Sequence, residues 1–83
     1  MNRGEVFGLI NDERARQSVK WDKPHQWGAG DCSAQLHPLV KLAVLTEECG
    51  EVARAVHDQE PTDRLRTELT QIAAVAVAWM ESL

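Results

Sequence analysis

The chain has 83 residues, 43% of them hydrophobic and 5% aromatic, with a formal net charge of −4. A chain of this length forms one domain, near the size at which a single hydrophobic core becomes marginal. The negative charge argues against a broad nucleic-acid or anionic-membrane surface, and no apolar run approaches the roughly 20 residues of a membrane span. Because Met1 precedes polar residues without an apolar segment, we expect no secretory signal and a cytoplasmic location.

The first predicted element is a helix over residues 3–19. Asn2 and Glu5 have the spacing of an N-terminal capping box, and an apolar stripe begins directly after them. Residues 20–36 contain two tryptophans, two glycines and several polar side chains, which predict a long loop. Loops of this length in so small a domain are often functional.

Two further helices are predicted over residues 38–57 and 62–82. Pro38 suits the first turn of a helix, with His37 as its cap, and residues 58–61 have the composition of a turn. Periodicity places one group of apolar side chains of the second helix on its core face. These side chains are Leu39, Leu42, Leu45, Cys49, Val52 and Val56.

The third helix is apolar on nearly all sides between Ile72 and Trp79. A helix that is apolar all round needs cover on every side, and three helices from one short chain cannot provide it. The fold class we expect is therefore all-α, with short helices forming an oligomeric four-helix-bundle core across a two-fold axis. The alternative is that this alanine-rich stretch is only a strong helix former.

Two acidic clusters lie within these apolar helices. Glu48 and Glu51 are three residues apart and project from one face of the second helix, and Glu68 and Gln71 do the same on the third. If the two helices face each other, these side chains form an oxygen-rich cage of the kind that binds Mg²⁺, with waters and substrate phosphates as further ligands. The alternative is that these are solvated glutamates, as most pairs at this spacing are.

The same residues resemble a known family. The sequences Leu-Thr-Glu-Glu-Cys-Gly-Glu-Val-Ala at 45–53 and Leu-Arg-Thr-Glu-Leu-Thr-Gln-Ile-Ala-Ala at 65–74, with residues 13–17 and Lys20-Trp21 upstream, look like the MazG-like all-α nucleoside triphosphate pyrophosphohydrolases. The likeness extends from about residue 13 to residue 83. The Glu-x-x-Glu element alone is weakly specific, whereas its combination with the second acidic helix and the Lys-Trp loop is fairly specific.

The resemblance implies a homodimeric or homotetrameric helical bundle that hydrolyses a nucleoside triphosphate to the monophosphate and pyrophosphate. It also implies Mg²⁺, or Mn²⁺, held by Glu48, Glu51 and Glu68. Gln71 stands where the family usually has a fourth, acidic ligand, and its amide offers a carbonyl oxygen but no charge. Either Glu47 enters the metal shell or one metal site is weakened. The alternative function is a catalytically weakened helical module that binds a nucleotide or a protein partner without turnover.

The remaining roles follow from the chemistry of that reaction. Glu47 or Glu48 is expected to accept the proton of the attacking water. Trp21 and Trp27 are candidates for stacking on the base, although Trp21 could instead pack against the core. The cationic candidates for binding the phosphate tail are Lys20, Lys41, Arg64 and Arg66. Whether Gln71 contacts metal or substrate, and which base and sugar are recognised, the sequence leaves open.

Overall fold

A computed structural model describes residues 1–26 and 28–83. Its elements are α1 (Arg3–Lys20), β1 (Pro24–His25), β2 (Gly28–Ala29), α2 (Pro38–His57) and α3 (Thr62–Glu81). The mostly helical character predicted from the sequence is confirmed. The segment predicted to be a loop differs in one respect, because it contains an antiparallel pair of two-residue strands. No helix in the described part of the chain has the length and hydropathy needed to cross a membrane.

Side chains cap the N-termini of α1 and α2. The Asn2 Oδ1 atom accepts a hydrogen bond from the backbone N–H of Glu5 at 2.8 Å, which is half of the predicted capping box. The His37 Nδ1 atom accepts from the backbone N–H of Leu39 at 3.1 Å, with Pro38 in the first turn. Such caps satisfy backbone donors that have no partner within the helix. The predicted helix limits therefore lie within about one residue of those observed.

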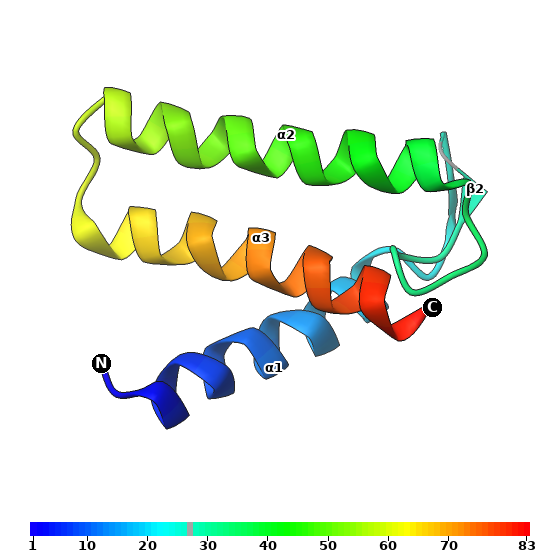
Figure 1. Ribbon diagram of the computed structural model, residues 1–83, viewed down its shortest axis with the longest axis horizontal. Coiled ribbons are helices and arrows are strands. Elements are labelled where there is room, and N and C mark those ends of the chain that lie inside the picture. The colour runs from blue at the N-terminus through cyan, green and yellow to red at the C-terminus, as the bar shows by residue number, and fades with distance from the viewer. Residues whose placement is uncertain (27) are drawn as a thin grey trace.

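Helix α3 is the centre of the molecule. Both α1 and α2 pack on it, and α1 and α2 do not pack on each other within the described residues. Figure 1 shows α2 (green) and α3 (yellow to red) side by side, with α1 (blue) on the other flank of α3. The segment that connects α1 to α2 runs across the end of the molecule at which α3 finishes. This arrangement leaves a space between α1 and α2 whose floor is α3.

The hydrophobic core is built from small side chains. Cys32, Val75 and Ala78 form its buried centre, with Val44 and Leu45 packed against them. Small residues at helix contacts allow the helix backbones to approach closely. Cys32 comes from the connecting segment rather than from a helix, so this segment is tied to the core at one point.

The predicted core face of α2 was wrong for Leu39, Leu42, Cys49 and Val56. All four are exposed, Leu39 at 68% and Val56 at 61% of their surface. The face that packs on α3 is a different one, and it includes the buried residue Ala55. The physical reason is that α2 is apolar on two sides and has only one neighbouring helix to cover it. We call Leu39, Leu42, Cys49 and Val56 the outer face of α2.

Candidate functional site

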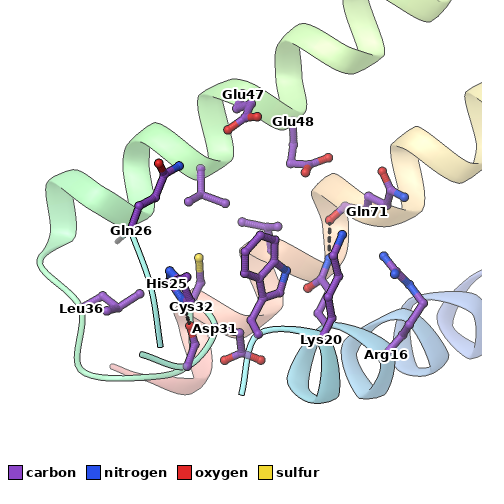
Figure 2. Close-up of a pocket in the computed structure, with 15 residues that line it drawn as sticks. Arg16, Lys20, His25, Gln26, Asp31, Cys32, Leu36, Glu47, Glu48 and Gln71 are labelled. Atoms are coloured by element: carbon purple, nitrogen blue, oxygen red, sulfur yellow. Dashed lines mark hydrogen bonds between the residues drawn. The ribbon is translucent and has the colours of Figure 1, made fainter. Parts of the chain in front are cut away.

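A cavity of about 220 Å³ lies between α1 and α2. Figure 2 shows it from the side, with α2 above, α1 below and the connecting segment at one end. Three of its sides are helices, and the polar side chains that they contribute face one another across the space. They are Arg16, Gln17 and Lys20 of α1, Glu47 and Glu48 of α2, and Gln71 of α3.

The end of the cavity is shaped by two glycines with positive φ. Gly28 has φ 125° and Gly30 has φ 87°, conformations that residues with a side chain rarely adopt. A Cβ atom on Gly28 would lie 2.8 Å from a side-chain carbon of Leu36, so space also requires glycine there. The His25 Nε2 atom donates to the Gly30 carbonyl oxygen at 2.8 Å. These features fold the segment back on itself, so that His25, Gly30 and the following Asp31 line the cavity.

Two buried carboxylate oxygens mark the acidic side of the site. Glu68 is only 3% exposed and Glu48 is half-buried. The Oε2 atoms of both are buried without a hydrogen-bond partner, and they are the two such side-chain atoms in the described part of the chain. The other oxygen of Glu68, Oε1, forms a salt bridge with Arg64 Nη2 at 2.9 Å. Because an unpaired buried acceptor is costly, this arrangement indicates a missing positive partner or a bound proton.

Repulsion between carboxylates adds to the cost of burial at Glu48. Burial raises the pKa of Glu48, and the nearby carboxylates of Glu68, Glu47, Glu51 and Glu13 raise it further, in that order. Both effects disfavour the charged form of Glu48. A divalent cation between Glu48 and Glu68 would relieve both of them.

Whether a cation fits this site depends on the side-chain atoms that are available to bind it. Among residues 1–26 and 28–83, no group of three or more His, Cys, Asp or Glu side chains is placed to hold a metal ion. The structure instead offers the two unpartnered oxygens of Glu48 and Glu68; Glu48 and Gln71 line the cavity, and Glu68 does not. Mg²⁺ is usually bound by one or two carboxylates and keeps several waters. Glu48 and Glu68 could supply two such carboxylates, and they do not form a closed cage.

The opposite wall of the cavity is basic. Arg16 and Lys20 lie on α1, across from Glu47 and Glu48 (Figure 2). Arg16 also pairs with Glu13, whose carboxylate oxygens lie 2.6 to 3.0 Å from the guanidinium, and this hydrogen bonding raises the pKa of Arg16. Sequence reasoning did not select Arg16. The signal was available, because residues four apart on a helix share a face and Arg16 precedes Lys20 by four.

Trp21 lies at the edge of the cavity. Trp21 is 38% exposed, so its ring is neither buried in the core nor fully accessible to solvent. The Lys20 Nζ atom lies 5.1 Å from the centroid of the Trp21 ring, and His25 makes an edge-to-face contact at 5.2 Å between ring centroids. Trp27, the other predicted stacking residue, lies outside the described residues.

The other described site residues predicted from the sequence do not line this cavity, and they are Glu51, Glu68, Lys41, Arg64 and Arg66. Lys41 is buried, and its Nζ atom donates to Ser82 Oγ at 2.6 Å. Arg64 is engaged with Glu68 on its own helix. Glu51 is half-buried one turn beyond Glu48. The structure thus places Glu47, Glu48, Gln71, Lys20 and Trp21 around one space, and Lys41 in a structural contact elsewhere.

Gln17 is a further cavity residue that sequence reasoning missed. It is buried, and its Nε2 atom donates to the backbone carbonyl oxygen of Gln71 at 3.4 Å, which links α1 to α3 beside the acidic pair. Nothing in the local pattern distinguishes it from other helical glutamines, so no sequence signal could have found it.

Comparison of the chain with known protein families, with curated proteins and with solved structures gave no match. The geometry described above and the resemblance of the two acidic helices are therefore the basis for a functional proposal.

Proposed function

We propose that the chain is a metal-dependent nucleoside triphosphate pyrophosphohydrolase. It would convert a ribo- or deoxyribonucleoside triphosphate and water into the monophosphate and pyrophosphate. The observation that supports this most is a pair of unpartnered carboxylate oxygens: that of Glu48, which lines a cavity with a basic wall, and that of Glu68, whose charge raises the pKa of Glu48. The sequence resemblance rests on the same two glutamates and supports the same reaction.

Glu48 and Glu68 would hold Mg²⁺ or Mn²⁺, with Glu51 and Gln71 as further oxygen donors one helical turn along each helix. When bound, such a cation neutralises phosphate charge and lowers the pKa of a bound water. Without that compensation, the acidic wall would repel a triphosphate. The two carboxylates would therefore contribute by holding the cation, and the cation would allow an anionic triphosphate to bind beside them.

The other side chains around the cavity would contact the water, the phosphates and the base of the substrate. Glu47 is exposed beside the cavity, where its carboxylate would accept a proton from the attacking water. Arg16 and Lys20 on the opposite wall would donate to phosphate oxygens. The partly exposed ring of Trp21 would stack on the base. Phosphate binding would require Arg16 to leave Glu13 and Lys20 to leave the Trp21 ring, because the phosphates carry more charge than either partner.

The proposal includes a homodimer or homotetramer. The cavity of about 220 Å³ is smaller than the roughly 300–1,000 Å³ typical of small-molecule sites, so a nucleoside triphosphate would extend beyond it. The outer face of α2, together with exposed Leu69 and Met80 on α3, offers apolar surface for a second copy. Pairing of these helices across a two-fold axis would give the four-helix bundle expected from the sequence.

A second candidate is a helical module that binds a nucleotide or a protein partner without turnover. The observation that favours it is Gln71, which supplies no charge where an acidic side chain would complete the donor set. In this alternative the cavity still binds phosphate through Arg16 and Lys20, and the reaction does not follow.

Pyrophosphate release measured across the common ribo- and deoxyribonucleoside triphosphates, with Mg²⁺ and with Mn²⁺, tests the proposal. We expect metal-dependent release with at least one nucleotide and none from the Glu48→Gln variant. Nucleotide binding without release would favour the second candidate. Neither binding nor release with any nucleotide would overturn the proposal and would leave, of the second candidate, only the module that binds a protein partner.

A further inference from the structure

Arg14 of α1 joins two distant parts of the chain. Its Nε and Nη2 atoms donate to the two carboxylate oxygens of Glu81 at 2.9 and 3.0 Å, and its Nη1 atom donates to Asp31 Oδ2 at 2.8 Å. The Arg14 side chain is only 12% exposed. The planar guanidinium group suits this task, because it can serve two carboxylates at once in fixed directions.

Asp31 is fully engaged on both of its oxygens. Its Oδ2 atom accepts from Arg14, and its Oδ1 atom accepts from the backbone N–H and the hydroxyl group of Ser33. Burial raises the pKa of Asp31, but the hydrogen bonds from Ser33 and Arg14 outweigh it and hold the pKa below its ordinary value. Although Asp31 lines the cavity, both of its carboxylate oxygens are already engaged by Arg14 and Ser33. Its contacts anchor the backbone around it instead.

The anchored segment, residues 28–36, forms one end of the cavity. Figure 2 shows Asp31 and Cys32 at that end, away from the helical part of α1 that carries Arg16. Arg14 itself does not line the cavity. Cys32 is inserted in the core next to the Asp31 anchor, so displacement of Asp31 would expose a thiol that is now buried.

We propose that Arg14 is a positioning residue: by bridging Asp31 and Glu81 it holds residues 28–36 against α1 and the end of α3, and thereby closes one end of the cavity. Its effect on a nucleotide rests on the proposed function. The closure itself does not, and it can be measured without any substrate.

The two free thiols of the chain provide the measurement. Cys32 is buried in the anchored segment and Cys49 is exposed on the outer face of α2, so Cys49 reports separately on that face and on its pairing with a second copy. Burial also raises the pKa of the Cys32 thiol, which slows its reaction with an alkylating reagent. Mass spectrometry after timed exposure to N-ethylmaleimide, with peptide mapping, gives the two rates separately.

We expect Arg14→Met to raise the labelling rate of Cys32 by about tenfold or more, since two charge-assisted contacts are lost. The rate at Cys49 should not change. Arg54→Met is the matched control, because Arg54 is exposed on α2 and the same change there should leave both rates as in the wild type. Arg14→Lys should recover only part of the protection, because one ammonium cannot serve both carboxylates in the same geometry.

A merely stabilising role for Arg14 gives a different result. In that case Cys32 labelling would follow the free energy of global unfolding measured by urea melts, without an additional local opening. That outcome, or an unchanged Cys32 rate, would overturn the proposal. If Arg14→Met does not fold, Asp31→Asn decides by the same criteria, because it weakens the arm that reaches the segment and leaves the Glu81 contact in place.

Nucleotide kinetics separate this inference from the proposed function. If the chain hydrolyses nucleoside triphosphates, Arg14→Met should raise KM several-fold at a largely unchanged kcat, and Arg54→Met should change neither. If it hydrolyses none, the proposed function fails, and the labelling result still decides whether Arg14 positions the segment.

Discussion

Replacing Glu48 with glutamine should stabilise the metal-free protein. The Oε2 atom of Glu48 is buried without a hydrogen-bond partner, and the carboxylate of Glu68 is close enough to raise its pKa. Glutamine has nearly the same shape and carries no charge. The substitution therefore removes repulsion and the cost of burying an anion, while it leaves the packing of α2 on α3 in place.

The size of the effect follows from burial. Leaving a buried acceptor unpaired costs about 1–3 kcal/mol, and more if it is charged. Glu48 is half-buried rather than fully buried, and glutamine still brings a polar oxygen to the same place, so the lower end of that range applies. A gain of about 1 kcal/mol corresponds to a rise of about 4–8 °C in Tm for a domain of this size.

Thermal melts of the wild type, Glu48→Gln and Glu47→Gln, each with and without Mg²⁺ or Mn²⁺, provide the assay. Glu47 is the matched control, because it is the adjacent carboxylate on the same helix and is exposed. In the wild type, metal at a hundred times its Kd should add about 2.7 kcal/mol. The Glu48→Gln variant should start higher and lose most of that metal-dependent gain.

Two results would refute this reasoning. If Glu48→Gln lowers the Tm of the metal-free protein, the carboxylate has a favourable partner and the unpartnered oxygen has been misread. If Glu47→Gln stabilises as much as Glu48→Gln, the gain comes from reducing the net negative charge and not from relieving a buried group.

Three further predictions concern the donor set, pH and assembly. Gln71→Asp should tighten Mg²⁺ binding if Gln71 is a weakened ligand position; calorimetry with Mg²⁺ alongside substrate KM decides this, since unchanged affinity with a much higher KM would make Gln71 a substrate contact. Hydrogen bonds from Arg14 lower the pKa of Glu81, so the stability that Glu81 contributes is lost as the pH falls through its lowered pKa. Burial and neighbouring carboxylates raise the pKa of Glu48, so Glu48 lowers the free energy of unfolding as the pH rises and its carboxyl ionises. Urea melts of the metal-free protein should therefore show a free energy of unfolding that falls on strong acidification and also declines as the Glu48 carboxyl ionises, and a steady rise up to neutral pH would contradict this. Sedimentation should show at least a dimer, and Leu42→Glu on the outer face of α2 should dissociate it; a stable wild-type monomer at micromolar concentration would exclude the bundle.

The helices could be predicted because their signals are local. Asn2 before the first helix and His37-Pro38 before the second act within one turn of the residues they cap, so sequence spacing is sufficient to recognise them. The strand pair in residues 21–36 could not, because two-residue strands are too short to show an alternating pattern.

The inward face of α2 shows where periodicity is insufficient. Glu48 and Ala55 lie on the buried side, and Leu39 and Val56, which are more hydrophobic, lie on the exposed side. Both stripes have helical spacing, and only the position of α3 decides which of them is covered. The burial of Glu48 was still foreseeable, because Val44 and Ala55 share its stripe.

Long-range polar contacts left no trace in the sequence. Arg14 reaches Asp31 across 17 positions and Glu81 across 67, and Lys41 reaches Ser82 across 41. At such separations no spacing rule applies, so an anchoring arginine and a buried lysine looked the same as exposed cations. Only the packing of the three helices identifies which cation has which task.

The central place of α3 has a mechanical consequence for the cavity. Because α1 and α2 both pack on α3 and not on each other, the distance between the basic and acidic walls is fixed only indirectly, through a third helix. A small tilt of α1 on α3 would widen or narrow the gap without disturbing either wall. A ligand that touches both walls would link two helices that otherwise do not pack on each other. Occupancy of the cavity would then set its width, and hydrogen exchange along α1 should slow when a ligand binds.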